Sequence, residues 1–300
     1  IKFIIISLSV FKYYRFNTFL SILALIISIL STEYIQNIIG VISILSIGIV
    51  HGANDLKIIS TFTNKDNRLN KLKYFSFYLL TVITGCLLFF FLPSLALLVF
   101  VLVSCFHFGE QHLESKIKPN KYNSFFYFFY GGLIFLLLFI IKHEDVSKVI
   151  FQITGINFES FFFKTLFLIF FFFSLRQILF KKKIDLLLIE ISLLLFFSLV
   201  FFNSTLIYSF SFYFIIWHSL PSLKSQINNL YGDFSYLSIY KYVKSSILYW
   251  LMAIVGLFSF YYFFNIQSNY FLPLFFSFLA AITFPHVIVI SLMFQTNKNN

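Results

Sequence analysis

Apolar runs long enough to cross a lipid bilayer occupy most of this 300-residue chain. A transmembrane helix needs about 20 predominantly apolar residues, and lipid gives the backbone no hydrogen-bond partners, so each run must satisfy its own backbone as a helix does. The residues do not alternate between polar and apolar as the strands of a membrane barrel would. We therefore predict an all-α fold, a polytopic transmembrane helix bundle of about ten helices. The runs fall at 17–32, 35–52, 74–92, 94–109, 124–141, 159–179, 184–202, 204–221, 245–265 and 270–294.

The composition supports a single integral membrane domain over residues 1–300. Hydrophobic residues make up 60% of the chain, charged residues only 11%, and a water-soluble domain of this size cannot bury so much apolar surface. No stretch is long and polar enough for a separate soluble domain. Both cysteines, Cys86 and Cys105, lie inside apolar runs, so the sequence indicates neither a disulfide framework nor a cysteine metal site.

The basic residues predict the orientation of the bundle. Net charge is +11, and with ten crossings all the lysines and arginines except Lys142, Lys148 and Lys164 fall on one side. The positive-inside rule makes that side cytoplasmic, with both termini there. This distribution accounts for the charge without a nucleic-acid partner. We expect a multi-pass protein of the cell inner (plasma) membrane, in direct contact with the lipid bilayer.

Four of the six histidines lie toward the cytoplasmic ends of four separate runs: His51, His107, His218 and His286. Ionisable side chains are costly in lipid and usually face the bundle interior. A lone membrane histidine is more often a packing or hydrogen-bonding residue than a ligand. Four at similar depth favour a shared metal ion, and imidazole suits iron, copper and zinc.

The other two histidines are interpreted differently. His143 falls in the loop after the fifth run, on the outer face, where we expect a solvated or interfacial side chain. His112 follows His107 by five residues, roughly 500° of helix rotation, so the two would not share a face. We expect His112 just beyond the helix end, in a loop; a ligand role is the alternative.

Three carboxylates are candidates for orienting a ligating imidazole, which a carboxylate does by fixing its tautomer. Asp55 follows His51 by four residues and would share its face on a continuing helix. Glu110 follows His107 by three residues. For both, a solvated helix-end carboxylate is the alternative. Glu190 lies inside the seventh run, at a depth close to His286, where it could orient a ligand or interact with Arg176.

Four strings of the sequence resemble the motifs of the Brp/Blh family, in the same order. The strings are HGANDL from His51, FHFGEQ around His107, WHS around His218 and PH at His286, and the resemblance spans roughly residues 40–295. This family comprises bacterial and archaeal membrane beta-carotene 15,15′-dioxygenases.

The resemblance implies a non-haem iron, Fe(2+), held by His51, His107, His218 and His286. It implies beta-carotene and O₂ as substrates, cleavage of the central 15,15′ double bond to give two retinal molecules, and a functional link to a retinal-binding opsin. One departure stands out. The family often has a second histidine four residues after the WH string, where this chain has Ser222; either His112 or water would fill that place.

Three other functions compete with this one. Diiron desaturases and hydroxylases usually need histidine clusters of the H-x-x-H or H-x-x-x-H type, and neither spacing occurs here. An opsin needs a mid-membrane lysine, and Lys164 is too near a run end. A transporter would need polar groups through the full membrane depth, whereas the candidates crowd one half. A transporter, or another membrane metalloenzyme acting on an apolar lipid, remains the alternative.

Overall fold

The computed structural model describes residues 2–62, 68–114, 116–117, 123–180, 184–263 and 270–299, and all regular structure within these ranges is helical. The predicted all-α class is therefore confirmed. Eight of the described helices are long and apolar enough to cross a membrane, and Phe16–Leu30 and Glu33–Gly48 are shorter apolar helices. Each of the ten predicted runs thus corresponds to an apolar helix.

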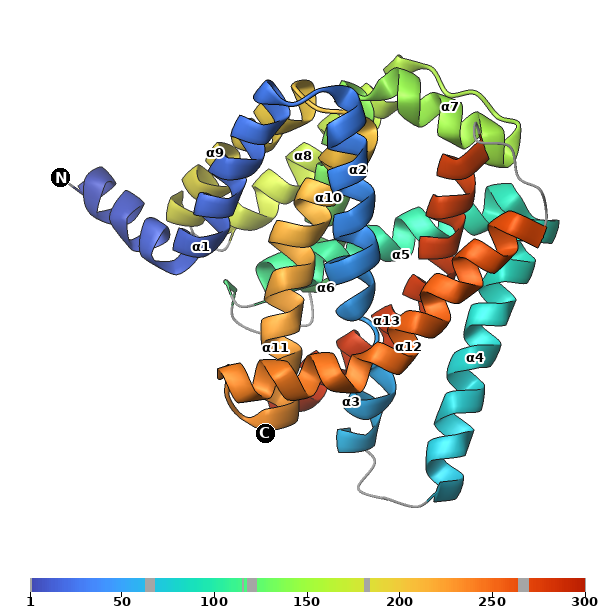
Figure 1. The fold of residues 1–300 in the computed structure, drawn as a ribbon. Coiled ribbons are helices and arrows are strands. Elements are labelled where there is room, and N and C mark those ends of the chain that lie inside the picture. Colours follow the sequence, from blue (N-terminus) through green and yellow to red (C-terminus); the bar gives the residue numbers. More distant parts are fainter. Residues whose placement is uncertain are drawn as a thin grey trace.

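The helices follow one another through the bundle with short connections (Figure 1). In chain order they are α1 (Lys2–Leu30), α2 (Glu33–Ser43), the π-helix η1 (Ile44–Gly48), α3 (Asp55–Phe62), α4 (Arg68–Phe91), α5 (Pro93–Leu113), α6 (Asn123–Ile141), α7 (His143–Thr154), α8 (Ser160–Phe180), α9 (Ile184–Phe202), α10 (Leu206–Phe212), the π-helix η2 (Tyr213–Ser219), α11 (Leu220–Tyr231), α12 (Tyr236–Phe263) and α13 (Phe271–Asn299).

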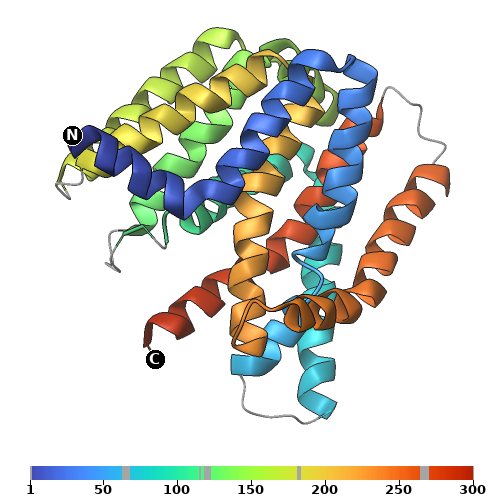
Figure 2. The ribbon, with the colours of Figure 1, turned by 60° about the vertical axis from the view of Figure 1, so that its left-hand side comes forward.

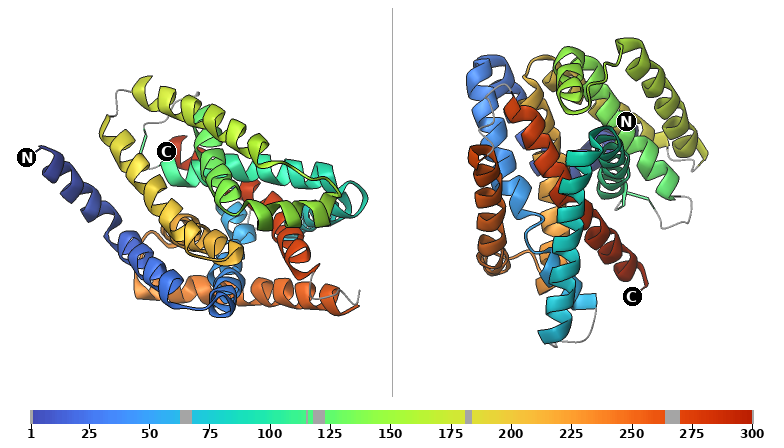
Figure 3. Two further views of the ribbon diagram at one scale, coloured as in Figure 1. Left: turned by 90° about the horizontal axis from the view of Figure 1, so that it is seen from above. Right: turned by 90° about the vertical axis from the view of Figure 1, so that its right-hand side faces the viewer.

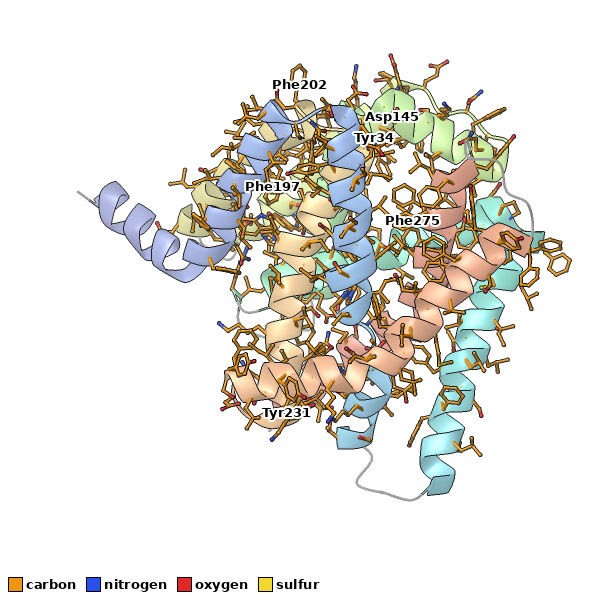
Figure 4. The ribbon with its side chains drawn as sticks, viewed as in Figure 1. Tyr34, Asp145, Phe197, Phe202, Tyr231 and Phe275 are labelled. Atoms are coloured by element: carbon orange, nitrogen blue, oxygen red, sulfur yellow. The ribbon has the colours of Figure 1, made fainter. Side chains whose placement is uncertain are left out.

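The bundle has two ends, which we name by the short helices that lie there. The α7 end carries Tyr34 and Asp145, and the α3 end carries Tyr231 (Figure 4). The α10–η2–α11 segment forms a buried central column (Figure 2), and α12 runs along the outside of the bundle (Figure 3). The orientation predicted from charge would make the α3 end cytoplasmic, and it stays a prediction.

The sequence predicts polar loops at 57–73 and 222–244, but both segments are largely helical where they are described. Residues of the first belong to α3 and α4, and residues of the second to α11 and α12. The loop prediction is wrong for these residues, and the two segments also contact each other: the Lys57 ammonium donates to the Tyr231 hydroxyl at 2.8 Å. The parts of the basic loops at 63–67, 118–122 and 181–183 lie outside the described residues.

Local signals in the sequence explain several helix boundaries. Thr32 and Thr205 have extended backbones and cap α2 and α10. Each side-chain oxygen accepts from the backbone N–H three residues later, that of Ile35 or of Tyr208. Pro93 occupies the first turn of α5, where its missing N–H costs nothing. Gly155 and Gly232 end α7 and α11 with φ of 71° and 84°, a conformation that glycine adopts readily.

Two glycines allow α5 and α6 to come into backbone contact. A methyl group added to Gly109 would lie 1.8 Å from the Tyr127 carbonyl oxygen, and one added to Gly131 would lie 1.9 Å from the Cys105 carbonyl oxygen. Small residues permit such close approach in membrane bundles. This contact fixes the segment of α5 that carries His107.

We predict that Gly109→Ala lowers the melting temperature of the detergent-solubilised protein, because the added methyl must separate two backbones; overpacking of this kind typically costs about 1–3 kcal/mol. Gly256→Ala is the matched control, since a methyl at that helical position meets no atom within 4 Å. The control should be neutral or slightly stabilising, as alanine favours helices over glycine. Equal melting temperatures for the two variants would contradict the close approach.

Candidate metal centre

Two π-helical segments position His51 and His218, while α5 carries His107 and α13 carries His286. The first, η1, ends three residues before His51, and the second, η2, contains His218. Single π-turns inside α-helices occur frequently at functional sites. Pro221 lies just beyond η2 and lacks the N–H that would bond the carbonyl of Trp217. This missing hydrogen bond explains from the sequence why the helix departs from α-helical geometry at η2.

The four histidine rings form one compact cluster. The ring centroids of His51 and His286 are 4.7 Å apart, and those of His51 and His218 are 5.3 Å apart. His107 lies 4.7 Å from His218 and 5.2 Å from His286. The structure therefore brings together the four imidazoles that the sequence singled out, from four different membrane segments.

The cluster fits a metal ion by distance. One ligating nitrogen from each of His51, His218 and His286 can be chosen so that all lie within 4.8 Å of one another. Nitrogens bonded to a common ion at about 2.1 Å can be at most about 4.2 Å apart. The three nitrogens are therefore close to the separations that a shared ion would impose, and the rings would have to move somewhat closer together to bind it.

The unpaired nitrogens of the cluster are the stronger evidence. Within the described part of the chain, the Nε2 atoms of His51 and His286 and both ring nitrogens of His107 and His218 are buried without a hydrogen-bond partner. A buried polar group without a partner is costly. Four of these six atoms, one from each ring, fit a shared cation that the imidazoles would ligate.

Contacts on the far side of the rings orient two imidazoles. His51 Nδ1 pairs with the Gly48 carbonyl oxygen of η1. His286 Nδ1 lies 2.9 Å and 3.1 Å from the two Asp55 oxygens, and the Tyr78 hydroxyl donates to the same carboxylate at 3.0 Å. In both rings Nε2 is left facing the cluster, which is the arrangement that a carboxylate or carbonyl gives to a metal-ligating histidine.

The sequence predicted the wrong partner for Asp55. Asp55 contacts His286 instead of His51, because residues 51–54 form a turn and the helix that would have joined Asp55 to the face of His51 does not continue. Gly52 lies in that turn, and its missing side chain leaves space for the His286 ring, whose Nδ1 would be 3.3 Å from an added methyl. Sequence reasoning also missed Tyr78, which carries no local signal.

The other two carboxylates and His112 lie apart from the cluster. Glu110 accepts from Ser291 at 2.8 Å. Glu190 contacts His112 at 3.0 Å and Lys116 at 2.7 Å, and accepts a hydrogen bond from Tyr130. His112 is buried inside α5, so the loop expected there was wrong. Glu190, His112, Lys116 and Tyr130 thus form a second buried polar group, which joins α5 and α6 to α9. The ring of Trp217 stacks on His112.

Ser222, the departure from the family pattern, belongs to a buried hydrogen-bonded chain. Gln226 donates to the Ser222 hydroxyl at 2.9 Å, and its own oxygen accepts from Tyr242 at 2.6 Å. The Tyr242 hydroxyl is also 3.1 Å from the His51 carbonyl oxygen. Ser222 therefore supports the backbone at His51 through two side chains.

A large apolar cavity of about 960 Å³ meets the cluster at His51 and His286. Its walls come mainly from α4, α12 and α13, and it continues past Gln152 of α7. The histidines thus lie near one end of the cavity, and its long part points toward the α7 end. The sequence could not assign these walls, because every run is similarly apolar.

The comparison with known families adds a match over most of the chain. Residues 42–294 match the family described as beta-carotene 15,15′-dioxygenase. The chain belongs to this family. The match includes all four clustered histidines, and it supports an oxygenase-type enzyme. No curated protein and no solved structure matches this family member significantly.

We predict that Asp55→Asn weakens metal binding about 10–100-fold, because an amide cannot give the His286 ring the same charge and orientation. The measurement is a titration of purified, metal-stripped protein with Fe(II) or Co(II). Asp145→Asn, an exposed acid at the opposite end, is the control and should bind as wild type. Unchanged affinity in Asp55→Asn would show that the carboxylate does not orient a ligand.

Proposed function

We propose that this protein is a non-haem iron dioxygenase that cleaves the central 15,15′ double bond of beta-carotene with O₂ and releases two retinal molecules. The observation that carries the proposal is the cluster of four buried imidazoles with unpaired nitrogens, opening onto an apolar cavity in a member of this family. A water-soluble substrate has no favourable contact with such walls, whereas a hydrocarbon polyene does.

His51, His107, His218 and His286 would hold the iron. Neutral imidazole suits iron among other metals, and four of them leave positions of an octahedron open. Bound iron(II) would supply the binding and activation of O₂. Asp55 and the Gly48 carbonyl would keep the Nε2 atoms of His286 and His51 directed at it.

The overall reaction balances without a further reductant. The central carbon–carbon double bond and the oxygen–oxygen bond break, and two carbonyl bonds form, so each retinal receives one oxygen atom. No proton is gained or lost overall. The chain's residues therefore need only to place the double bond beside the histidines and keep water away.

The cavity walls suit these two tasks. Phe75 and Tyr78 of α4, Phe214 of η2 and Tyr249 of α12 line the part near the histidines. Aromatic faces pack flat against a conjugated polyene and exclude water from it. The membrane in which the protein lies and any opsin that uses the product stay predictions from the sequence.

We predict that His51→Ala or His218→Ala abolishes retinal formation when the protein is expressed in a beta-carotene-producing bacterium. Each removes one ring of the cluster and leaves fewer than the four proposed ligands. Retinal is measured by chromatography of the cell extract, and iron by elemental analysis of the purified protein. His143→Ala is the control, because His143 contacts the Phe158 carbonyl oxygen and Ser147, away from the cluster. Wild-type retinal from either cluster variant would rule out that histidine as a ligand.

A further inference from the structure

The two membrane helices that flank the cavity are the least buried of the described long spans. Only 6% of the α4 span and 11% of the α12 span are buried inside the protein, against 17–78% for the other six. Figure 3 shows α12 on the outer edge of the bundle. Few residues of either helix are fully buried, and both helices also form walls of the cavity.

Several residues on each wall both line the cavity and are exposed. On α4 these include Cys86 and Phe90, and on α12 they include Met252, Gly256 and Phe260. In the described part of the chain, α4 packs mainly against α3, α5 and α13, and α12 packs against α11 and α13. The two walls thus make little direct contact with each other, and the side of the cavity between them is the one that helix packing leaves open.

The shape of the substrate gives this opening a purpose. A symmetric polyene cut at its centre has two arms of equal length. The histidines lie near one end of the cavity, with His51 and His286 on its wall and Phe75 only one helical turn beyond Tyr78. The long part of the cavity encloses one arm, and an opening between α4 and α12 along that part would let the polyene pass into it from the bilayer.

We propose that beta-carotene enters the cavity through a lateral portal between α4 and α12. Gly256 is then a specificity-determining residue, because its missing side chain keeps this portal wide enough for the ring at the end of the polyene. The proposal rests on the proposed function for the identity of the polyene. It adds the route, the walls and the residue that sets the width.

Gly256 is suited to this role because no neighbouring atom lies close to the position of its missing side chain. It lies in the C-terminal half of α12, lines the cavity and is exposed, and a methyl group at its Cα would meet no atom within 4 Å. Packing against another helix therefore does not require glycine here. Ala253, one turn earlier, and Cys86 on the opposite wall also line the cavity with small side chains.

The test fills the portal from one wall and compares binding with cleavage. Gly256→Phe and the control Val255→Phe are purified, stripped of metal and placed in lipid nanodiscs. Val255 is exposed on the same helix but does not line the cavity. Beta-carotene is added, and the visible circular dichroism of the bound, otherwise achiral polyene is recorded against empty nanodiscs. We expect Gly256→Phe to weaken binding about tenfold or more, and Val255→Phe to bind as wild type.

The metal-loaded variants complete the test. Gly256→Phe should raise KM for beta-carotene more than it lowers kcat, and should affect an acyclic carotene of the same length less, because no ring must pass. Its iron content should equal that of wild type. Cys86→Phe fills the portal from α4, with Ile83→Phe as its control, and gives the same comparison if Gly256→Phe does not fold.

The outcomes separate the two proposals. Wild-type binding and cleavage by both Gly256→Phe and Cys86→Phe would overturn the portal and leave the dioxygenase function intact. A wild-type protein that binds beta-carotene with an induced signal, lost in these variants, but forms no retinal would overturn the function and leave the portal.

Discussion

The structure depends on the cost of burying imidazoles whose nitrogens have no hydrogen-bond partner. Four rings from four membrane segments meet near the α3 end, and six of their nitrogens are unpaired within the described part of the chain. In lipid no water enters to satisfy them. A shared cation could bind one nitrogen from each ring, and the proposed iron would then also join the four segments that carry these histidines.

The surroundings of the cluster keep this arrangement in place. The Gly48 carbonyl and Asp55 hold two rings from behind. Phe108 and Phe214 pack against the His218 ring, with centroids at 4.3 Å and 5.5 Å. On the far side of η2, His112 and Glu190 form a separate buried network. The site is therefore supported by polar contacts outside it and by aromatic packing around it.

Family membership and geometry together separate the proposed function from its rivals. The match at residues 42–294 supports an oxygenase-type enzyme, and the cavity beside the histidines is mainly apolar. A transport path would need polar groups through the membrane depth, whereas the described polar cluster lies near one end of the cavity. The opening between α4 and α12 suits a substrate that is dissolved in the bilayer.

The sequence by itself determined the helical class, the apolar helices and the choice of the four histidines. Hydropathy and the positions of rare polar residues can be read directly from the sequence, and in lipid they decide which segments form helices and which side chains face inward. It failed at Asp55, whose partner is His286 because the chain turns after His51, and at His112, which lies inside a helix paired with Glu190. Only the tertiary structure decided these partners, the walls of the cavity and the open side between α4 and α12. Uniformly apolar helices carry little information about which faces meet, so close contacts such as that of Gly109 with Tyr127 settle the packing.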